Sequence, residues 1–270
     1  MKRQLAIFFL ISFTISWSVW LPLYGHHIGL QTTSPLTYQH ALGALGPMIA
    51  AMITSMIYGG RKEVTRLLLQ MIKPGGIYAL IALLSPFALA ILAMAPAIIT
   101  QQSPGLLSGL VHNNEFPHFG IFTLIIYNLV FFGFGEESGW RGFVLPRLQS
   151  RFNALQSALL LTIPWAVWHL PLFLYRPGYM SMDIAGAVGW ILSLLTGSIL
   201  LSWFYNSTRG SILVCAIFHA CIDIPFTASI STQVAGVTGM LITLWGLATI
   251  FFFKSQALCR SGKMQTFMNA

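Results

Sequence analysis

Charged residues are scarce in this sequence. Only 7% of its 270 positions carry Asp, Glu, Lys or Arg, whereas a soluble domain has about a quarter of its residues charged. Apolar residues instead occupy 56% of the positions. This composition excludes an ordinary soluble domain and predicts an integral membrane protein.

Cysteines and linkers are also few. The three cysteines, Cys215, Cys221 and Cys259, are an odd number, and two of them lie in an apolar run, so no disulfide framework is predicted. No Pro/Ser-rich linker or long charged stretch divides the chain, and we therefore predict a single membrane domain over residues 1–270. Lys2 and Arg3 precede a long apolar stretch without a small-residue cleavage site, so we expect an uncleaved first helix.

Long apolar runs are abundant. A bilayer core of about 30 Å requires about 20 apolar residues per helix, and the sequence contains eight candidate runs. They are Leu5–Tyr24, Ala41–Tyr58, Ile77–Thr100, Phe119–Gly135, Ala154–Leu174, Ile184–Tyr205, Ile212–Ser229 and Gly236–Phe253. We predict an all-α, polytopic protein with about eight transmembrane helices. The fourth helix is expected to continue through Glu136 to Leu145, because Pro146 is the first strong helix breaker.

The basic residues predict an orientation. All but one of the 14 Lys and Arg residues fall on alternate loops, the exception being Arg176. Such an asymmetry is typical of cytoplasmic loops, so both termini are predicted to be cytoplasmic, in what we expect to be a bacterial plasma membrane. The net charge of +8 is explained by this orientation and by contact of the loops with the lipid bilayer, and no nucleic-acid partner is needed.

Few ionisable residues lie within or at the ends of the predicted helices, where such groups are costly and are usually functional. They are Glu136, Glu137, Arg141, His169, His219 and Asp223. The other histidines map to the extracytoplasmic loops or their edges, where a solvated or interfacial role is expected. These are His26, His27, His40, His112 and His118.

The spacing of these residues predicts partners. Glu137 and Arg141 are four residues apart on a helix and can form an ion pair. Glu136 is rotated away from Arg141 and is left without that partner. His219 shares a helix face with Asp223, as Trp165 does with His169. We therefore expect three helices to present polar faces to one pocket in the cytoplasmic half of the bundle.

This set of groups suits the activation of water. Glu136 beside the neutral imidazole of His169 is a competent general base. His219 and Asp223 can then stabilise a developing oxyanion, with His219 as the better donor. Hydrolysis of an amide bond fits this inventory.

Three short motifs carry a family resemblance. Glu136 to Arg141 fits Glu-Glu-x-x-x-Arg, Trp165 to His169 fits aromatic-x-x-x-His, and His219 to Asp223 fits His-x-x-x-Asn/Asp. In this order the motifs resemble those of the CAAX protease and bacteriocin-processing enzyme family, also called the Abi family. The resemblance covers about residues 119–225, and it is the combination of the motifs that makes it specific.

The resemblance implies an intramembrane endopeptidase that hydrolyses a peptide bond of a membrane-associated protein or peptide. By this resemblance, Glu136 and His169 activate water, and His219 and Asp223 form an oxyanion site. Glu137 and Arg141 support the site structurally. Asp223 stands where the enzymes that process prenylated proteins have Asn.

Other functions use the same residues. Glu136, His169 and His219 could form a zinc site with an open position, although the sequence has no His-Glu-x-x-His helix. Without zinc, no cofactor is expected. Intramembrane Glu and His residues also build proton-coupled transporters. A binding or immunity protein could retain the fold without turnover. The intact set of six residues favours an enzyme that uses Glu and His without a metal.

Overall fold

The structure, a computed structural model, describes residues 1–99, 106–110, 112–113, 116–228, 230 and 232–260. These residues form helices and turns, and they contain no strand beyond one isolated bridge between Asn113 and Ala228. The helices of the first part are α1 (Lys2–Tyr24), the 3₁₀ turn η1 (Gly25–Ile28), α2 (Gln39–Ala44), α3 (Gly46–Met71), α4 (Ile77–Ile99) and α5 (Leu106–Leu110).

The later elements begin with five consecutive helical segments, two of them π-helical. These are α6 (Ile121–Asn128), the π-helix η2 (Leu129–Phe134), α7 (Gly135–Gly139), the π-helix η3 (Trp140–Val144) and α8 (Leu145–Gln149). They are followed by α9 (Ala154–Trp168), α10 (Leu172–Tyr175), α11 (Pro177–Met180), α12 (Ile184–Ser207), α13 (Ile212–Thr227) and α14 (Thr232–Phe253).

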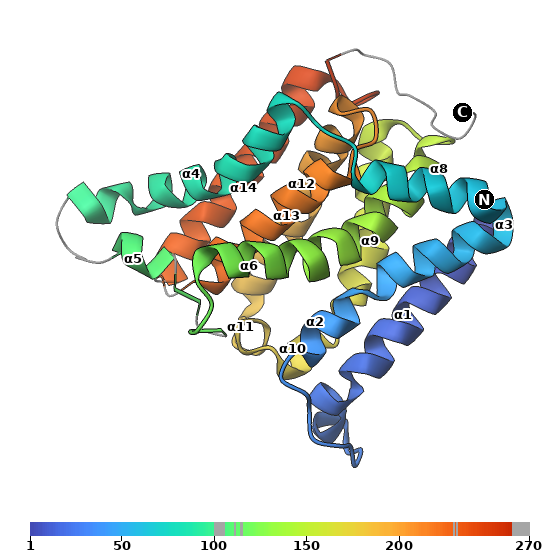
Figure 1. Ribbon diagram of the computed structural model, residues 1–270. Helices are drawn as coiled ribbons and strands as arrows, with labels where there is room; N and C mark the ends of the chain where they lie inside the picture. The colour runs from blue at the N-terminus through green and yellow to red at the C-terminus, as the bar shows by residue number, and fades with distance from the viewer. Residues whose placement is uncertain (100–105, 111, 114–115, 229, 231, 261–270) are drawn as a thin grey trace.

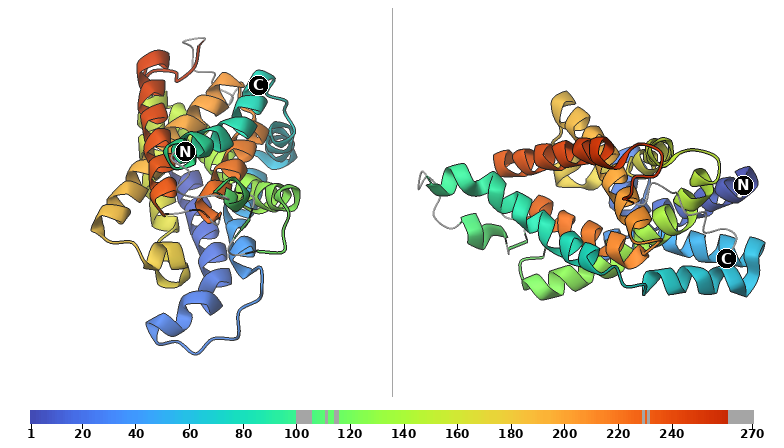
Figure 2. Two further views of the ribbon diagram at one scale, coloured as in Figure 1. Left: turned by 90° about the vertical axis from the view of Figure 1, so that its left-hand side faces the viewer. Right: turned by 90° about the horizontal axis from the view of Figure 1, so that it is seen from above.

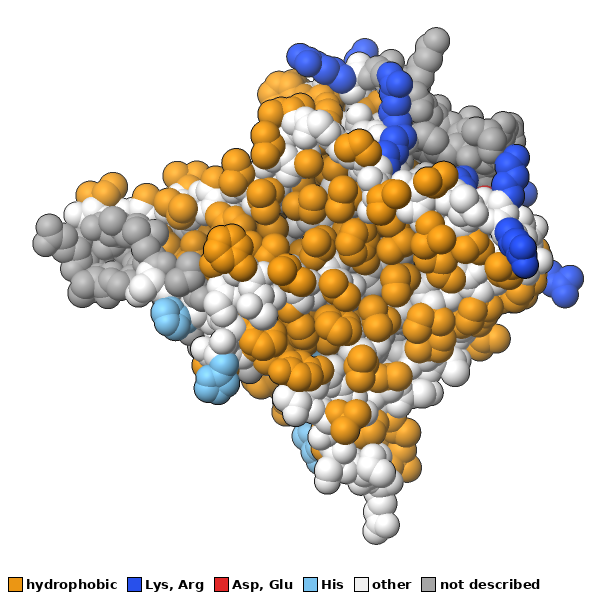
Figure 3. Space-filling model, viewed as in Figure 1, with side chains coloured by type: hydrophobic (Ala, Val, Ile, Leu, Met, Phe, Trp, Pro, Cys, Tyr) orange, Lys and Arg blue, Asp and Glu red, His pale blue; other side chains and the backbone are white. Residues whose placement is uncertain are grey.

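The predicted fold class is confirmed. Seven helical stretches of the described chain are long and apolar enough to cross a membrane, and each matches one of the predicted runs. The remaining run forms α13, which is apolar but has only 16 residues. The ends of two predicted runs, Thr100 and Ser229, lie outside the described residues. Apolar side chains cover most of the face seen in Figure 3, as expected of a surface in contact with lipid.

The fourth predicted helix is longer than expected. Its five segments follow one another without a break from Ile121 to Gln149. Pro146 does not end it, and α8, which contains Pro146, follows directly after the π-helical segment η3. We call this continuous stretch the site helix. It carries the first motif near its middle, with Glu136 and Glu137 between the two π-helical segments and Arg141 in the second of them.

Glycines let the site helix approach its neighbours closely. A Cβ atom on Gly133 would lie 2.6 Å from the carbonyl oxygen of Ala216 in α13. A Cβ atom on Gly139 would lie 2.8 Å from the carbonyl oxygen of Pro47 in α3. Small residues at such contacts are typical of helix packing in membranes. The site helix therefore approaches α13 and α3 closely, at glycines on either side of Glu136 and Glu137.

Polar caps define where the other site-bearing helices begin. Asn153 and Gln156 form a reciprocal capping box at the start of α9. The hydroxyl of Ser211 accepts a hydrogen bond from the Val214 N–H at the start of α13. The short turn of residues 150–153 brings α9 directly back against the site helix, and α8 and α9 pack together.

The helices form two groups around the site helix (Figure 1). α1 packs on α2, α3 and α10, whereas α14 packs on α4, α12 and α13. α3 and α13 both contact α7, the segment that carries the two adjacent glutamates. Figure 2 shows the same arrangement from two further directions. The first motif thus lies at the centre of the bundle.

Candidate active site

The ionisable residues of the three motifs meet in the interior. Glu136 is 3% exposed, His169 and His219 are each 7% exposed, and Glu137 and Arg141 are fully buried. Each of the two imidazole rings lies close to the indole of Trp165, at centroid distances of 5.8 Å for His169 and 5.9 Å for His219. The predicted convergence of three helices is therefore present in the structure.

Glu137 binds two partners with one carboxylate oxygen. Its Oε1 accepts a hydrogen bond from Arg141 Nη1 at 3.0 Å, and it lies 2.6 Å from His219 Nδ1. The predicted ion pair with Arg141 is confirmed. The bond to His219 was not predicted, and it joins the first motif to the third. Since all three groups are buried, Glu137 fixes the ring of His219 in the pocket.

Glu136 is held by a different helix. Its Oε2 accepts a hydrogen bond from Trp165 Nε1 at 2.8 Å. The expectation that Glu136 points away from Arg141 agrees with this geometry. The donor, however, is the indole of Trp165, whereas the sequence suggested only the imidazole of His169 as a neighbour of Glu136. Trp165 therefore orients the carboxylate that was proposed to be the base.

The ring orientation of His169 follows from the end of its own helix. His169 is the C-cap of α9, and its Nδ1 lies 2.7 Å from the carbonyl oxygen of Trp165. A carbonyl can only accept, so Nδ1 carries the proton and donates it to this bond. In the neutral ring, Nε2 is then left with a lone pair. That nitrogen can accept a proton or a hydrogen bond within the pocket.

Asp223 lies at the more open side of the site. Its side chain is 33% exposed, and its Oδ2 is 3.8 Å from Nε2 of His219. This distance is too long for a hydrogen bond but allows electrostatic attraction. His219 therefore lies between two carboxylates, those of Glu137 and Asp223. These neighbours favour a cationic ring with an N–H on each nitrogen.

Trp165 was not predicted as a site residue, yet it contacts four of the six motif residues. Besides Glu136 and the two histidines, it carries the guanidinium of Arg141 above its ring at 4.3 Å. This stacking covers a guanidinium whose Nε and Nη2 atoms have no hydrogen-bond partner among the described residues. The available signal was the position of Trp165, four residues before His169 on the same face of a helix.

Glu136 lies near the middle of the site helix, 15 residues after Ile121 and 13 before Gln149. α9 ends at Trp168, so His169 lies about one α9 length from the short turn that joins the two helices. Glu136 and His169 are therefore at similar distances along their helices from this turn.

One of the remaining histidines packs more closely than a fully solvated group would. His40, expected to be solvated or interfacial, is half-buried in α2, with its Nδ1 2.7 Å from the hydroxyl of Tyr175. Its ring stacks on Trp20 at 5.6 Å. The short helix α2 folds back against α1, a packing that the sequence pattern does not reveal.

A zinc ion at the residues considered for it would have to bind Nε2 of the two histidines. Nδ1 of each histidine is engaged, by the carbonyl of Trp165 in one case and by Glu137 in the other. One carboxylate oxygen of Glu136 accepts a hydrogen bond from Trp165. Within the described chain, no three His, Cys, Asp or Glu side chains come together closely enough to hold a metal ion.

The fold and the site together define a polytopic, all-helical membrane protein with a buried Glu–His centre. Residues 118–225 match the family model described as type II CAAX prenyl endopeptidase Rce1-like. This segment contains all three motifs, so the predicted family resemblance is confirmed for the part of the chain that carries the site.

One curated relative shows the same correspondence. The CAAX prenyl protease 2 of Methanococcus maripaludis is 31% identical over 107 residues. The aligned segment covers 38% of this chain and 40% of that relative. α1 to α4 and α14 lie outside the segment matched by the family model.

Proposed function

We propose that the protein is an intramembrane endopeptidase of the CAAX prenyl protease type that hydrolyses a peptide bond of a membrane-associated protein or peptide. The observation that carries this proposal is the position of Glu136. Its carboxylate is buried, is oriented by Trp165, and shares the pocket with two imidazoles whose Nδ1 atoms are already engaged. The match of the surrounding segment to a family of membrane endopeptidases supports the same reaction.

In the proposed mechanism, Glu136 removes a proton from a water molecule while Nε2 of His169 accepts a hydrogen bond from the same water. The oxygen of the water attacks the carbonyl carbon of the scissile amide, and the negative charge moves to the carbonyl oxygen. A cationic His219 donates a hydrogen bond to this oxyanion. When the C–N bond breaks, Glu136 returns the proton to the leaving nitrogen, which gives a carboxylic acid and an amine.

The other two members of the set support this step. Arg141 neutralises Glu137, so that Glu137 can hold His219 without adding an uncompensated charge to the pocket. Asp223 faces the second nitrogen of His219 and is partly exposed. In this proposal it stabilises the cationic form of His219 and does not itself donate to the oxyanion.

Substitution of Glu136 by Gln tests the proposal. We expect kcat for a fluorogenic peptide carrying a prenylated C-terminal CAAX sequence to fall by about 10²–10⁴-fold. Asp183→Asn is a matched acid-to-amide control, because Asp183 caps α12 away from the motifs and Asn is an equally good cap. Both variants should remain folded in detergent.

The same assay separates the alternatives. A transporter requires two compartments, so steady peptide turnover in detergent that depends on Glu136 would exclude a role limited to transport. A binding or immunity protein would show equal peptide signals for the wild type and Glu136→Gln. That second result would contradict the proposed hydrolysis.

We further propose that the reaction uses no metal, because the candidate ligands of the described chain do not come together closely enough to hold an ion and Glu136 is oriented by Trp165. Activity should then be unchanged after treatment of the purified protein with o-phenanthroline or EDTA. The control is a zinc protease treated in parallel under the same conditions. Loss of activity on chelation, followed by recovery on addition of zinc, would show instead that Glu136, His169 and His219 rearrange to hold the ion.

The proposed orientation places both termini and the basic loops in the cytoplasm. Figure 3 shows Lys and Arg side chains gathered along one edge of the visible face and His side chains at another. This separation supports the asymmetry found in the sequence. With this orientation in a bacterial plasma membrane, a peptide substrate anchored at the cytoplasmic leaflet would approach the site from the basic side of the protein.

A further inference from the structure

The last four carbonyl groups of α9 have no following helical N–H to pair with, so each needs another hydrogen-bond donor. The carbonyl of Trp165 accepts a hydrogen bond from Nδ1 of His169 at 2.7 Å, and that of Ala166 accepts one from the backbone N–H of His169 at 3.1 Å. The backbone N–H of Leu170 donates a hydrogen bond to the carbonyl of Val167 at 3.1 Å. The backbone and side chain of the proposed water-binding histidine thus cap its own helix.

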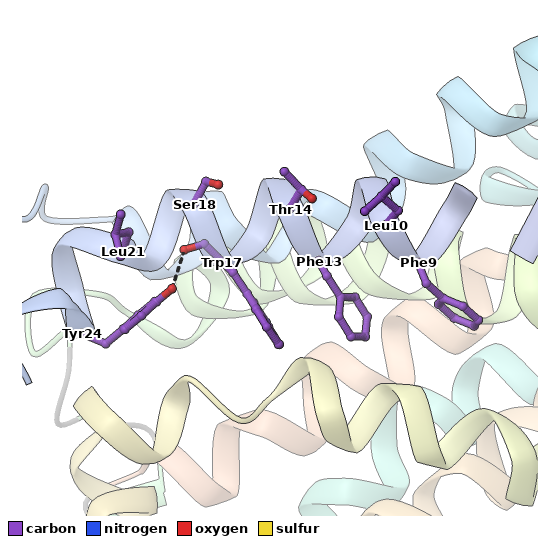
Figure 4. Close-up of a pocket in the computed structure, with 8 residues that line it drawn as sticks. All are labelled: Phe9, Leu10, Phe13, Thr14, Trp17, Ser18, Leu21 and Tyr24. Atoms are coloured by element: carbon purple, nitrogen blue, oxygen red, sulfur yellow. Dashed lines mark hydrogen bonds between the residues drawn. The ribbon is translucent and has the colours of Figure 1, made fainter. Parts of the chain in front are cut away.

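The fourth carbonyl, that of Trp168, is the only one paired with a distant part of the described chain. It accepts a hydrogen bond at 3.1 Å from Nε1 of Trp17 in α1. Figure 4 shows the Trp17 side chain directed from α1 toward the neighbouring helix. α1 lies outside the segment matched by the family model.

The contact between α1 and the end of α9 is reinforced by a second tryptophan. Trp20 packs against Trp168 with ring centroids 4.7 Å apart, and Trp168 in turn meets the ring of His169 at 4.9 Å. Trp168 is only 1% exposed, so solvent has little access to the residue whose carbonyl Trp17 pairs. Removal of the Trp17 donor would leave a carbonyl unsatisfied one residue before His169.

We infer that Trp17 is a positioning residue for His169, which it holds in place through the carbonyl of Trp168. The inference rests on the proposed function, because it concerns the alignment of a group that binds the attacking water. Small displacements of such a group are costly to the rate, whereas substrate affinity is set by other contacts. The expected effect is therefore on kcat and not on KM.

Trp17→Phe keeps an aromatic ring and removes the N–H donor. We expect kcat to fall about tenfold while KM changes by less than about twofold. Trp203→Phe is the control, because it makes the same change at a buried tryptophan whose Nε1 has no hydrogen-bond partner among the described residues. Wild-type kcat in Trp17→Phe would overturn the inference.

Chemical rescue distinguishes the hydrogen bond from packing. Trp17 lines an open groove of about 490 Å³ along α1, so the space left by Trp17→Ala is accessible to a small molecule (Figure 4). Added indole should restore part of kcat, whereas benzofuran, which has an oxygen in place of the N–H group, should not. Equal rescue by both compounds would show that Trp17 acts only by filling space.

A spectroscopic test keeps this inference separate from the proposed function. In ¹⁵N-histidine NMR spectra of the folded protein, Trp17→Phe should shift the ring signals of His169 and leave those of His219 unchanged. Unchanged His169 signals would contradict the positioning role even if the enzyme is active. Conversely, peptide cleavage that is independent of Glu136 would contradict the proposed reaction but would not change what the NMR spectra show about Trp17 and His169.

Discussion

At the residue scale, two adjacent glutamates differ in every partner they have. Glu137 is fully buried and binds Arg141 and His219, whereas Glu136 binds the indole of Trp165. Neighbouring residues on a helix point about 100° apart, so the two carboxylates face different helices. The chain thereby separates a structural acid from a reactive one within two consecutive positions.

This difference predicts that a Glu→Gln substitution affects stability at one position and activity at the other. Glu137→Gln should lower the free energy of unfolding by about 3–5 kcal/mol, because it leaves the buried guanidinium of Arg141 without a counter-charge. Glu136→Gln removes no ion pair and should retain stability while losing activity. Unfolding in detergent, followed by circular dichroism, measures both.

A double variant checks the cause of that loss. In Glu137→Met/Arg141→Met both charges are removed, so much of the lost stability should return, although activity should not. If the double variant is no more stable than Glu137→Gln, the loss arises from the contact with His219 and not from the unpaired guanidinium.

Spacing along one helix was sufficient to predict the contact between Glu137 and Arg141, because a separation of four residues fixes it. It also placed Trp165 on the face of His169. The bonds from Glu137 to His219 and from Glu136 to Trp165 each join two helices. Their existence depends on the rotation and depth of both helices, which a single sequence does not specify.

At the scale of elements, the site helix is shaped by its π-helical segments and glycines. η2 and η3 lie on either side of α7, the single α-helical segment that carries Glu136 and Glu137. Wider turns of this kind are frequently found at functional sites. The sequence predicted a continuous helix here but gave no sign of the wider turns, which in the structure pack on α13 (η2) and on α3 and α13 (η3).

Gly133→Ala tests the close contact between the site helix and α13. The new Cβ atom would lie 2.6 Å from the carbonyl oxygen of Ala216, so the helices must separate. We expect a loss of about 1–3 kcal/mol in stability, together with reduced activity as His219 moves away from Glu137. Thermal unfolding and peptide cleavage are the measurements.

Gly189→Ala in α12 is the control for the helix propensity of alanine, because nothing lies within 4 Å of its added Cβ atom. This variant should be as stable as the wild type or slightly more stable. If Gly133→Ala behaves like Gly189→Ala, close approach at Gly133 is not needed to assemble the site.

At the scale of the whole molecule, hydropathy alone was enough to locate the long apolar helices. Each predicted run corresponds to an apolar helix of the described chain, since a lipid-exposed segment must satisfy its backbone internally. Hydropathy did not reveal which helices are neighbours. The packing of α2 and α10 against α1 leaves His40 half-buried and brings α1 to the end of α9, and no local pattern encodes that arrangement.

The proposed orientation makes a prediction about accessibility. In a chain whose three cysteines, all buried, are replaced by Ala, single cysteines are introduced at two exposed positions, His27→Cys and Arg151→Cys. A membrane-impermeant maleimide added to intact cells should label position 27 and should label position 151 only after the membrane is opened. The reason is that a segment rich in Arg is retained on the cytoplasmic side, whereas the loop after α1 carries no Lys or Arg. Labelling of position 151 in intact cells would show that the protein has the opposite orientation, with the approach to Glu136 on the other side of the membrane.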